Sequence, residues 1–331
     1  MPRQPLPYFV LTIALIGGVG VFVWKKSTAV SPLTQAPPIA SPPRVAPPRV
    51  APQSTRLNFL TDIGQPYQAR IDQFRSVLSE DCSEPELRYL YQLLENPAPQ
   101  GELSEHWYVI ANDIMTQILA HETDPQRFAT TFTGLLSNSN QPEVIRDYAV
   151  QYLAEWLNPR STQATASSLA APSPQLATQV LQSLVTATMD PALEQSSIPG
   201  TSLMMLIDLK RSVNTIDCSE AIAALKPWLT RALRDGSTLS NPVRVSAVSA
   251  AGILAPTEFR PLIRQIAYQE NGTSSLRLPA IAAIGRAGET EDLPKLRQIA
   301  TSSPELSYAA LGAHDTLSSL LNLGTASSSS Q

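Results

Sequence analysis

Two short stretches bring together side chains that bind metals or move protons. The stretch ELSEH places Glu102 and His106 four residues apart on one helix face, a pairing that could ligate a metal ion. The stretch HETD adds His121, Glu122 and Asp124 at the junction of two helices. A solvated helix start accounts for the first pair, and caps and turns account for the second group. We therefore predict no metal site at either place.

Sequence patterns that mark enzymes are absent from the chain. It contains no HExxH, GxSxG, P-loop or Rossmann glycine pattern, and no serine has a neighbouring base that the sequence singles out. The two cysteines, Cys82 and Cys218, form no CxxC pair. We expect buried thiols, with one long-range disulfide as the alternative in an oxidising compartment. The sequence thus predicts a protein that is not an enzyme, has no catalytic residues and holds no cofactor.

Composition indicates a folded domain without the charge that nucleic-acid binding needs. The 331 residues are 43% hydrophobic and 16% charged, with a net charge of −4 at pH 7. Nucleic-acid-binding proteins concentrate positive charge to neutralise phosphates. We therefore predict no nucleic-acid partner, and a length sufficient for one large domain or two ordinary ones.

An arginine recurs at the same place in several helical stretches. In NQPEVIRDYAVQYL, Arg146 stands just inside a helix that a turn residue and a proline precede. The segments VRVSAVSAAG and LRLPAIAAIG repeat the arrangement with Arg244 and Arg277. Alanines and a terminal glycine in these two segments match at the same interval as the two arginines. The arginine therefore belongs to an internal repeat.

The segments that follow these helices repeat with the same period. RPLIRQIA and LPKLRQIA carry Pro261 and Pro294 near their starts, and the interval between these prolines equals that between Arg244 and Arg277. KPWLTRAL carries Pro227 one such interval earlier, to within a single residue. A period in the thirties with two helices per period predicts a solenoid, in which stacked helix pairs share one core.

The glycines that end the two repeated segments have an expected structural place. Gly252 closes VRVSAVSAAG and Gly285 closes LRLPAIAAIG. We expect both at helix C-terminal positions, where a left-handed backbone is needed.

The region from 124 to 321 resembles the HEAT repeat family, most specifically across VRVSAVSAAG and LRLPAIAAIG. That resemblance implies an all-α fold, a right-handed α-α superhelix. The repeat arginine of that family is generally structural and hydrogen-bonds turn residues to link neighbouring repeats. The resemblance therefore implies the same role for Arg146, Arg244 and Arg277.

Side chains for contact with a partner are harder to find in the sequence. We expect the aromatic residues at helical spacing to lie in the core, with a ligand-binding surface as the alternative: Trp107, Tyr108, Tyr148, Tyr152 and Trp156. The candidate partner-binding residues are three neighbours at the start of one repeated helix: Arg146, Asp147 and Tyr148.

Residues 7–24 form an apolar run without a charged residue. As a helix, Tyr8 to Trp24 would span roughly 26 Å, close to the thickness of a bilayer core. Both end residues are aromatic, as is common at membrane interfaces. A cleaved signal peptide is the alternative, but Lys25 and Lys26 follow the run directly and argue against cleavage there. We predict an uncleaved transmembrane helix.

The short tail 1–6 favours a signal-anchor orientation, with the C-terminal domain outside the cytoplasm. Arg3 on one side nearly balances the lysines on the other, so charge alone leaves the orientation open. We predict a single-pass protein of the inner (cytoplasmic) membrane. Ala14 and Gly18 are four residues apart and would allow close contact of two such helices, which would make a homodimer.

A proline-rich linker, 25–56, follows the apolar run and contains PPRVA twice in tandem. Such a stretch favours polyproline II at ~3.1 Å per residue, so it would hold the domain off the bilayer. Its PxxP spacing also allows a docking motif for a proline-reading partner. The repeat domain is expected at 57–323, with capping boxes in SEPE and SSPE, and a disordered tail at 324–331.

Three functions are compatible with these features. The first is a membrane-anchored scaffold that binds a protein partner through the solenoid surface. The second follows from the resemblance, because some HEAT-like proteins resemble lyases that attach or detach bilin chromophores; those relatives are soluble, whereas this chain has an apolar N-terminal run. The third is a non-catalytic structural protein of the cell envelope. We favour the first.

Overall fold

The computed structural model describes residues 56–77, 82–158, 168–212, 216–235 and 238–328. The tail 1–6, the apolar run 7–24 and nearly all of the linker 25–56 lie outside the described residues. Within the described part, no helix combines the length and apolar character needed to cross a bilayer. The chain divides into Met1–Ala51 and Pro52–Gln331, and every described helix belongs to the second unit.

The prediction of an all-α fold is confirmed for the described residues, which contain helices and no strand. Within the described ranges the 3₁₀ helices are Asn58–Thr61, Pro191–Leu193 and Pro304–Leu306. The α-helices are α1 (Tyr67–Val77), α2 (Glu84–Glu95), α3 (Ser104–His121), α4 (Pro125–Ser137), α5 (Glu143–Leu157), α6 (Pro174–Met189), α7 (Ile198–Ser212), α8 (Ser219–Arg234), α9 (Asn241–Leu254), α10 (Pro256–Tyr268), α11 (Ser274–Ala287), α12 (Asp292–Ser302) and α13 (Ser307–Ser328).

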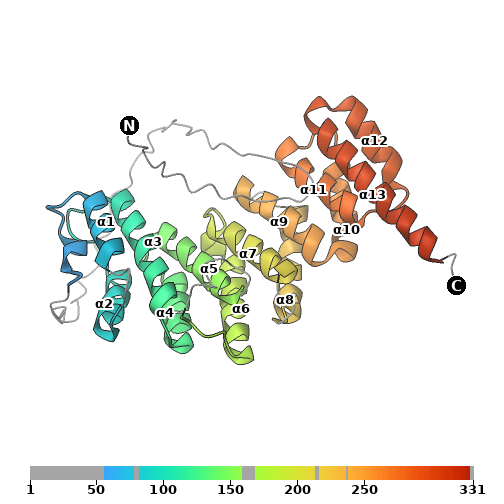
Figure 1. The fold of residues 1–331 in the computed structure, drawn as a ribbon. Coiled ribbons are helices and arrows are strands. Elements are labelled where there is room, and N and C mark those ends of the chain that lie inside the picture. The colour runs from blue at the N-terminus through green and yellow to red at the C-terminus, as the bar shows by residue number, and fades with distance from the viewer. Residues whose placement is uncertain (1–55, 78–81, 159–167, 213–215, 236–237, 329–331) are drawn as a thin grey trace, which may run out of the picture. The chain divides into compact units, whose positions relative to one another are not determined.

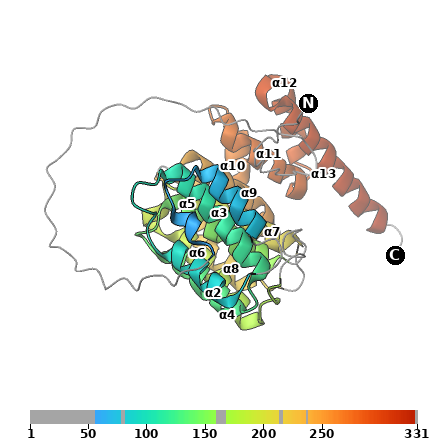
Figure 2. The ribbon, with the colours of Figure 1, turned by 60° about the vertical axis from the view of Figure 1, so that its left-hand side comes forward.

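Helices that alternate along the chain pack into two layers. The odd layer is the series α1, α3, α5, α7, α9, α11 and α13, in which each helix contacts the next. The even layer is the series α2, α4, α6, α8 and α10, and α12 packs against α13. Figures 1 and 2 show α2 and α4 on the same side of α3. One continuous core of buried aliphatic and aromatic side chains lies between the layers, as expected when helix pairs cannot bury their apolar faces alone.

Helix starts follow the local sequence at some places and not at others. The predicted capping box at Ser83 is present, with Glu86 accepting from the Ser83 backbone N–H at 2.8 Å. Asp124 caps α4 by accepting from two backbone N–H groups. The predicted box in SSPE does not form, because Ser302 ends α12 and its hydroxyl donates to the Gln298 carbonyl.

The repeated glycines serve helix packing, which corrects their predicted place at helix ends. Gly252 and Gly285 lie inside α9 and α11, and neither has a positive φ. A Cβ at Gly285 would lie 2.7 Å from the Cα of Ala313 on α13, and one at Gly252 would lie 2.4 Å from the Cβ of Ala283 on α11. Because glycine has no side chain, successive odd helices approach closely at these two positions.

The helices are longer than the proline pattern suggests. Pro227 and Pro261 lie inside α8 and α10, and Pro294 is the third residue of α12. The last helix continues to Ser328, beyond residue 323 where the predicted repeat domain ends. Gly324 could end a helix at this point, but no proline follows and α13 continues through the glycine.

Candidate functional site

Partly exposed side chains recur along the helices of the odd layer. On α9 and α11 these positions recur at the interval of the repeat, which places Val245 with Leu278, and Ile253 with Arg286. On α5 and α7 the corresponding stripes include Tyr148, Gln151, Met204 and Met205. We call this surface of α5, α7, α9 and α11 the odd face. It combines charged side chains such as Arg286 with apolar side chains that their neighbours cover only in part.

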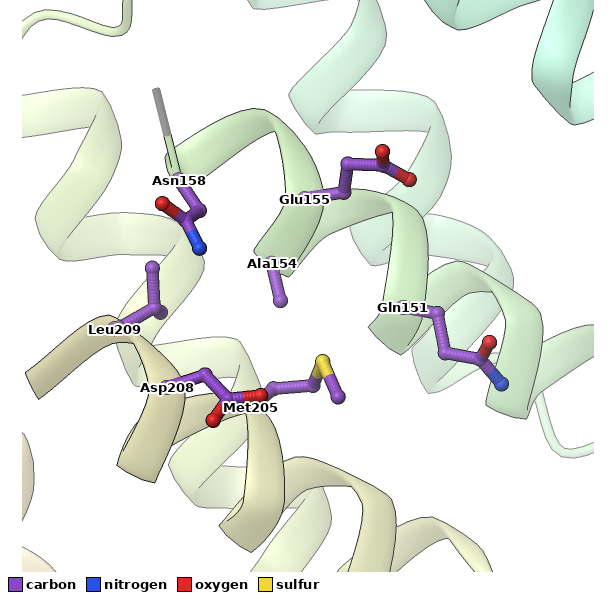
Figure 3. Close-up of a pocket in the computed structure, with 7 residues that line it drawn as sticks. All are labelled: Gln151, Ala154, Glu155, Asn158, Met205, Asp208 and Leu209. Atoms are coloured by element: carbon purple, nitrogen blue, oxygen red, sulfur yellow. The ribbon is translucent and has the colours of Figure 1, made fainter. Parts of the chain in front are cut away.

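The odd face is hollowed where α5 meets α7 (Figure 3). The hollow has a volume of about 230 Å³ and opens to solvent. Ala154 and Met205 approach it from opposite helices, and Asn158 lies at its end (Figure 3). The seven residues that line it are Gln151, Ala154, Glu155 and Asn158 of α5 with its C-cap, and Met205, Asp208 and Leu209 of α7.

Asp208 is the distinctive charge of this hollow. Its neighbours cover part of the carboxyl group, and this burial raises the pKa of Asp208 despite the attraction of Arg211 one turn further along α7. Asp208 accepts no hydrogen bond and makes no ion pair with the described residues. Glu155 lines the opposite wall. A carboxylate that burial disfavours and that lacks a partner is suited to a cation supplied from outside.

The predicted partner-binding residues Arg146, Asp147 and Tyr148 are split by the structure. Arg146 is buried and points to the core side, so it is no exposed recognition residue. Asp147 accepts from the Ser197 hydroxyl at 3.1 Å and thereby ties α5 to the segment that leads into α7. Tyr148 remains half-buried on the odd face, one turn before Gln151 of the hollow.

The three repeat arginines do not share one environment. Nε of Arg146 donates to the Leu136 carbonyl at 2.8 Å, and Nε of Arg277 donates to the Ala267 carbonyl at 3.1 Å. Each bond reaches ten residues back, to the last turn of the preceding helix, which suits the structural role that the resemblance implies. Nε of Arg244 is buried and has no hydrogen-bond partner within the described residues.

Arg70, which belongs to none of the repeated segments, makes a similar contact. Its Nη1 donates to the Leu60 carbonyl, again ten residues earlier, at 3.0 Å. Its other terminal nitrogen pairs with Glu102 at 2.6 Å, and both side chains are buried. The predicted solvated helix start at Glu102 is therefore wrong, because this carboxylate neutralises a buried guanidinium. His106 stacks on Tyr67 at 4.1 Å beside this pair.

Glu122, expected only to cap a turn, is fully buried at the centre of a hydrogen-bond network. It accepts from Nε of Arg127 at 2.7 Å, from the Tyr91 hydroxyl at 2.7 Å and from the backbone N–H groups of Thr123 and Asp124. Burial raises the pKa of Glu122, but these donors outweigh burial and hold its pKa below the ordinary value. The result joins α2 to the turn before α4.

Arg127 extends the same network to the surface. Its terminal nitrogens donate to Glu84 at 2.6 and 2.9 Å, and its guanidinium lies over the Tyr91 ring. Hydrogen bonds from Arg127 and Arg88 lower the pKa of Glu84 to about 2. We call the group Tyr91, Glu122 and Arg127 the Glu122 clamp.

A second clamp of the same chemistry closes the turn before α12. Asp292 is buried and accepts from the Arg264 guanidinium at 2.8 and 2.7 Å, from the Tyr268 hydroxyl at 2.6 Å and from the Glu289 backbone at 2.8 Å. Burial raises the pKa of Asp292, and the donors, Arg264 first, reverse this and lower it. We call the group Tyr268, Asp292 and Arg264 the Asp292 clamp.

Neither cysteine is oxidised in the structure. Cys82 and Cys218 are free thiols, and Cys218 is buried. Burial, together with nearby Glu86, raises the pKa of Cys82 to about 12, so its thiolate is scarce at neutral pH. Among the described residues no group of three or more His, Cys, Asp or Glu side chains could hold a metal ion.

Comparison with known proteins adds no relative. No protein-family model, curated protein or solved structure matches this chain.

Proposed function

We propose that this protein is a membrane-anchored helical-repeat scaffold that binds a protein partner through the odd face. The repeats would form a HEAT-like, right-handed α-α superhelix. Residues 7–24 would anchor the chain as a single span in the inner membrane, with the linker 25–56 placing the repeat domain outside the cytoplasm. In this proposal the protein performs no catalysis.

The observation that carries the proposal is the contrast between the odd face and the clamps. In the clamps, charged side chains pair with one another, as Glu122 does with Arg127 at 2.7 Å. On the odd face, Met204, Met205 and Ile253 are partly exposed, and Met205 lines a hollow beside Asp208, a carboxylate that makes no ion pair with the described residues. Partly exposed apolar surface with a few polar groups is typical of protein-binding sites.

Photocrosslinking in intact cells tests the proposed face. A photoreactive amino acid at position 205 lies at the hollow, whereas the same amino acid at position 182 lies on an exposed side of α6 in the even layer. We expect a discrete crosslinked protein from position 205 and none from position 182. Equal crosslinking at both positions, or none at position 205, would contradict a binding face on the odd layer.

Protease protection tests the proposed topology. Protease added to cells with a permeabilised outer layer should digest the C-terminal domain while the inner membrane is intact. Protection until that membrane is lysed would place the domain in the cytoplasm and overturn the proposed orientation. A soluble chain after cell fractionation would overturn the anchor itself.

A further inference from the structure

Asp208 lines the hollow and makes no hydrogen bond or ion pair with the described residues. Elsewhere, buried carboxylates are neutralised at short range, as Glu102 is by Arg70 at 2.6 Å. Asp208 has no such partner among the described residues, although its neighbours cover part of its carboxyl group. Partial burial of a charge without a partner costs free energy, so a group that supplies the missing charge would gain from binding there.

The floor of the hollow has the opposite character. Ala154, Met205 and Leu209 present methyl and thioether groups next to the carboxylate, and the Asn158 side chain lies at the end (Figure 3). The volume of about 230 Å³ exceeds that of a few water molecules, since one water takes about 30 Å³ in the liquid. A long side chain with an apolar stem and a polar head fits this combination.

We propose that the hollow between α5 and α7 receives an arginine or lysine side chain of a protein partner, with the cationic head on Asp208 and the stem on Met205 and Ala154. The inference rests on the proposed function and names the chemistry of the partner's contact. Glu155 is a second carboxylate among the residues that line the hollow. A basic partner segment also suits a chain whose net charge is −4.

Arg211 is the nearest competitor for this role. It stands three residues beyond Asp208 and attracts the carboxylate, but no hydrogen bond joins the two side chains. Its attraction stabilises the ionised form only in part, since burial still raises the pKa of Asp208. An incoming guanidinium would therefore replace only the weak attraction of Arg211, because no ion pair has to be broken.

Titration of the full chain in detergent tests the inference. The probe is acetyl-Ala-Arg-Ala-amide, and its matched control carries citrulline, which keeps the shape of arginine and lacks its charge. With ¹³C-labelled methionine methyl groups, the Met205 signal reports the hollow and the buried Met115 signal is an internal reference. We expect the arginine peptide to shift Met205 saturably, with a dissociation constant on the order of millimolar, and citrulline to leave it unchanged.

Three variants sharpen the titration. Asp208→Asn should weaken binding of the arginine peptide at least about fivefold, because it removes a charge-assisted hydrogen bond. Glu270→Gln removes an exposed carboxylate in the loop before α11 and should leave binding unchanged. Arg211→Gln removes the competing charge and should strengthen binding about twofold.

Equal binding of the arginine and citrulline peptides, or unchanged binding by Asp208→Asn, would overturn the inference. Its failure is distinguishable from failure of the proposed function. Crosslinks from position 205 that persist in the Asp208→Asn protein would retain the scaffold and reject the cationic contact. Peptide binding without any crosslink in cells would retain the cationic contact and reject the scaffold.

Discussion

Glu122 and Asp208 are two carboxylates at the ends of odd-layer helices, and their surroundings differ completely. Glu122 is the C-cap of α3, is fully buried and accepts hydrogen bonds from Arg127, Tyr91 and the backbone. Asp208 lies in the last turns of α7, is partly covered and has no hydrogen-bonding partner among the described residues. Their pKa values accordingly move in opposite directions, down for Glu122 and up for Asp208.

This difference gives the two carboxylates different roles: Glu122 stabilises the fold, and Asp208 is available to bind a cation. Inside the clamp every charge is answered, so removal of one member leaves the others buried and unpaired. At the hollow the unanswered charge costs a little stability and creates a preference for a cation. The same side-chain chemistry therefore supports the fold at one place and offers a contact at another.

Recurrence of the clamp shows that the contrast is not an accident of one turn. The Asp292 clamp, far along the chain, again combines a carboxylate with an arginine fork and a tyrosine hydroxyl. In both clamps the tyrosine belongs to an even-layer helix, α2 or α10. The carboxylate lies at the turn before α4 in the first clamp and before α12 in the second. The clamps thus fasten successive repeats, whereas Asp208, in the hollow between α5 and α7, makes no ion pair with the described residues.

The largest effect should come from breaking the first clamp. Glu122→Gln removes the charge that Arg127 and Tyr91 share, while Arg127 keeps its hydrogen bonds to Glu84. We expect a loss of about 3 kcal/mol in the free energy of unfolding, the lower end of the range for breaking a buried ion pair. Urea unfolding followed by circular dichroism measures it. A loss below about 1 kcal/mol would show that the clamp is not a main support of the fold.

A smaller effect should follow from removing one hydroxyl from each clamp. Tyr91→Phe and Tyr268→Phe each delete a hydrogen bond to a carboxylate, of 2.7 and 2.6 Å, and keep the ring. We expect losses of about 1.5 kcal/mol in both, because hydrogen bonds to charged groups contribute about that much. Tyr148→Phe is the matched control on the odd face and should change stability little. Clearly unequal losses would mean that the two clamps are not equivalent.

Most of the fold could be predicted from the spacing of apolar residues, because the periodicity of a helix is local in the sequence. The repeats with Arg146 and Arg277 become paired helices, and the arginines reach the carbonyl groups that end the preceding helix. The predicted place of the two glycines is wrong for a physical reason: a glycine near the end of a helical pattern fits a left-handed cap as well as close packing. Only the neighbour on the next odd helix, Ala313 for Gly285, decides between them.

The candidate site could not be found in the same way. The hollow joins residues of α5 to residues of α7, with the whole of α6 between them in the sequence, and Asp208 belongs to no repeated motif. The clamps could not be predicted from the sequence either. HETD alone indicates a capped turn, and only the fold shows that the Tyr91 hydroxyl donates to Glu122. A signal was present in the pairing of an acidic turn with an arginine a few residues later, as in Glu122 and Arg127.

Acid should act oppositely on the two carboxylates. The folded pKa of Glu122 lies below its ordinary 4.5, so its stabilisation is complete above that value and is lost as pH falls through the depressed folded pKa. The folded pKa of Asp208 lies above its ordinary 3.8, so the cost of its ionised form disappears as pH falls toward that value.

Unfolding in urea between about pH 3 and pH 7 checks both directions. The stability gap between the native chain and Glu122→Gln should narrow below pH 4.5. Any advantage of Asp208→Asn should be present at neutral pH and vanish in acid. A gap for Glu122→Gln that stays constant into the acid range would mean that its charge is not what the clamp needs.

The smallest effect is the one that distinguishes the hollow from the clamps most directly. Asp208→Asn keeps the shape of the side chain and removes a charge that nothing in the described fold answers, so the free energy of unfolding should stay equal or rise slightly. The rise should not exceed about 0.5 kcal/mol, because solvent reaches Asp208 and screens it. Thermal unfolding of the full chain in detergent measures it at neutral pH. A loss of more than about 1 kcal/mol would show that Asp208 supports the fold as Glu122 does, and the hollow would then be one more closed junction with no charge left for a partner.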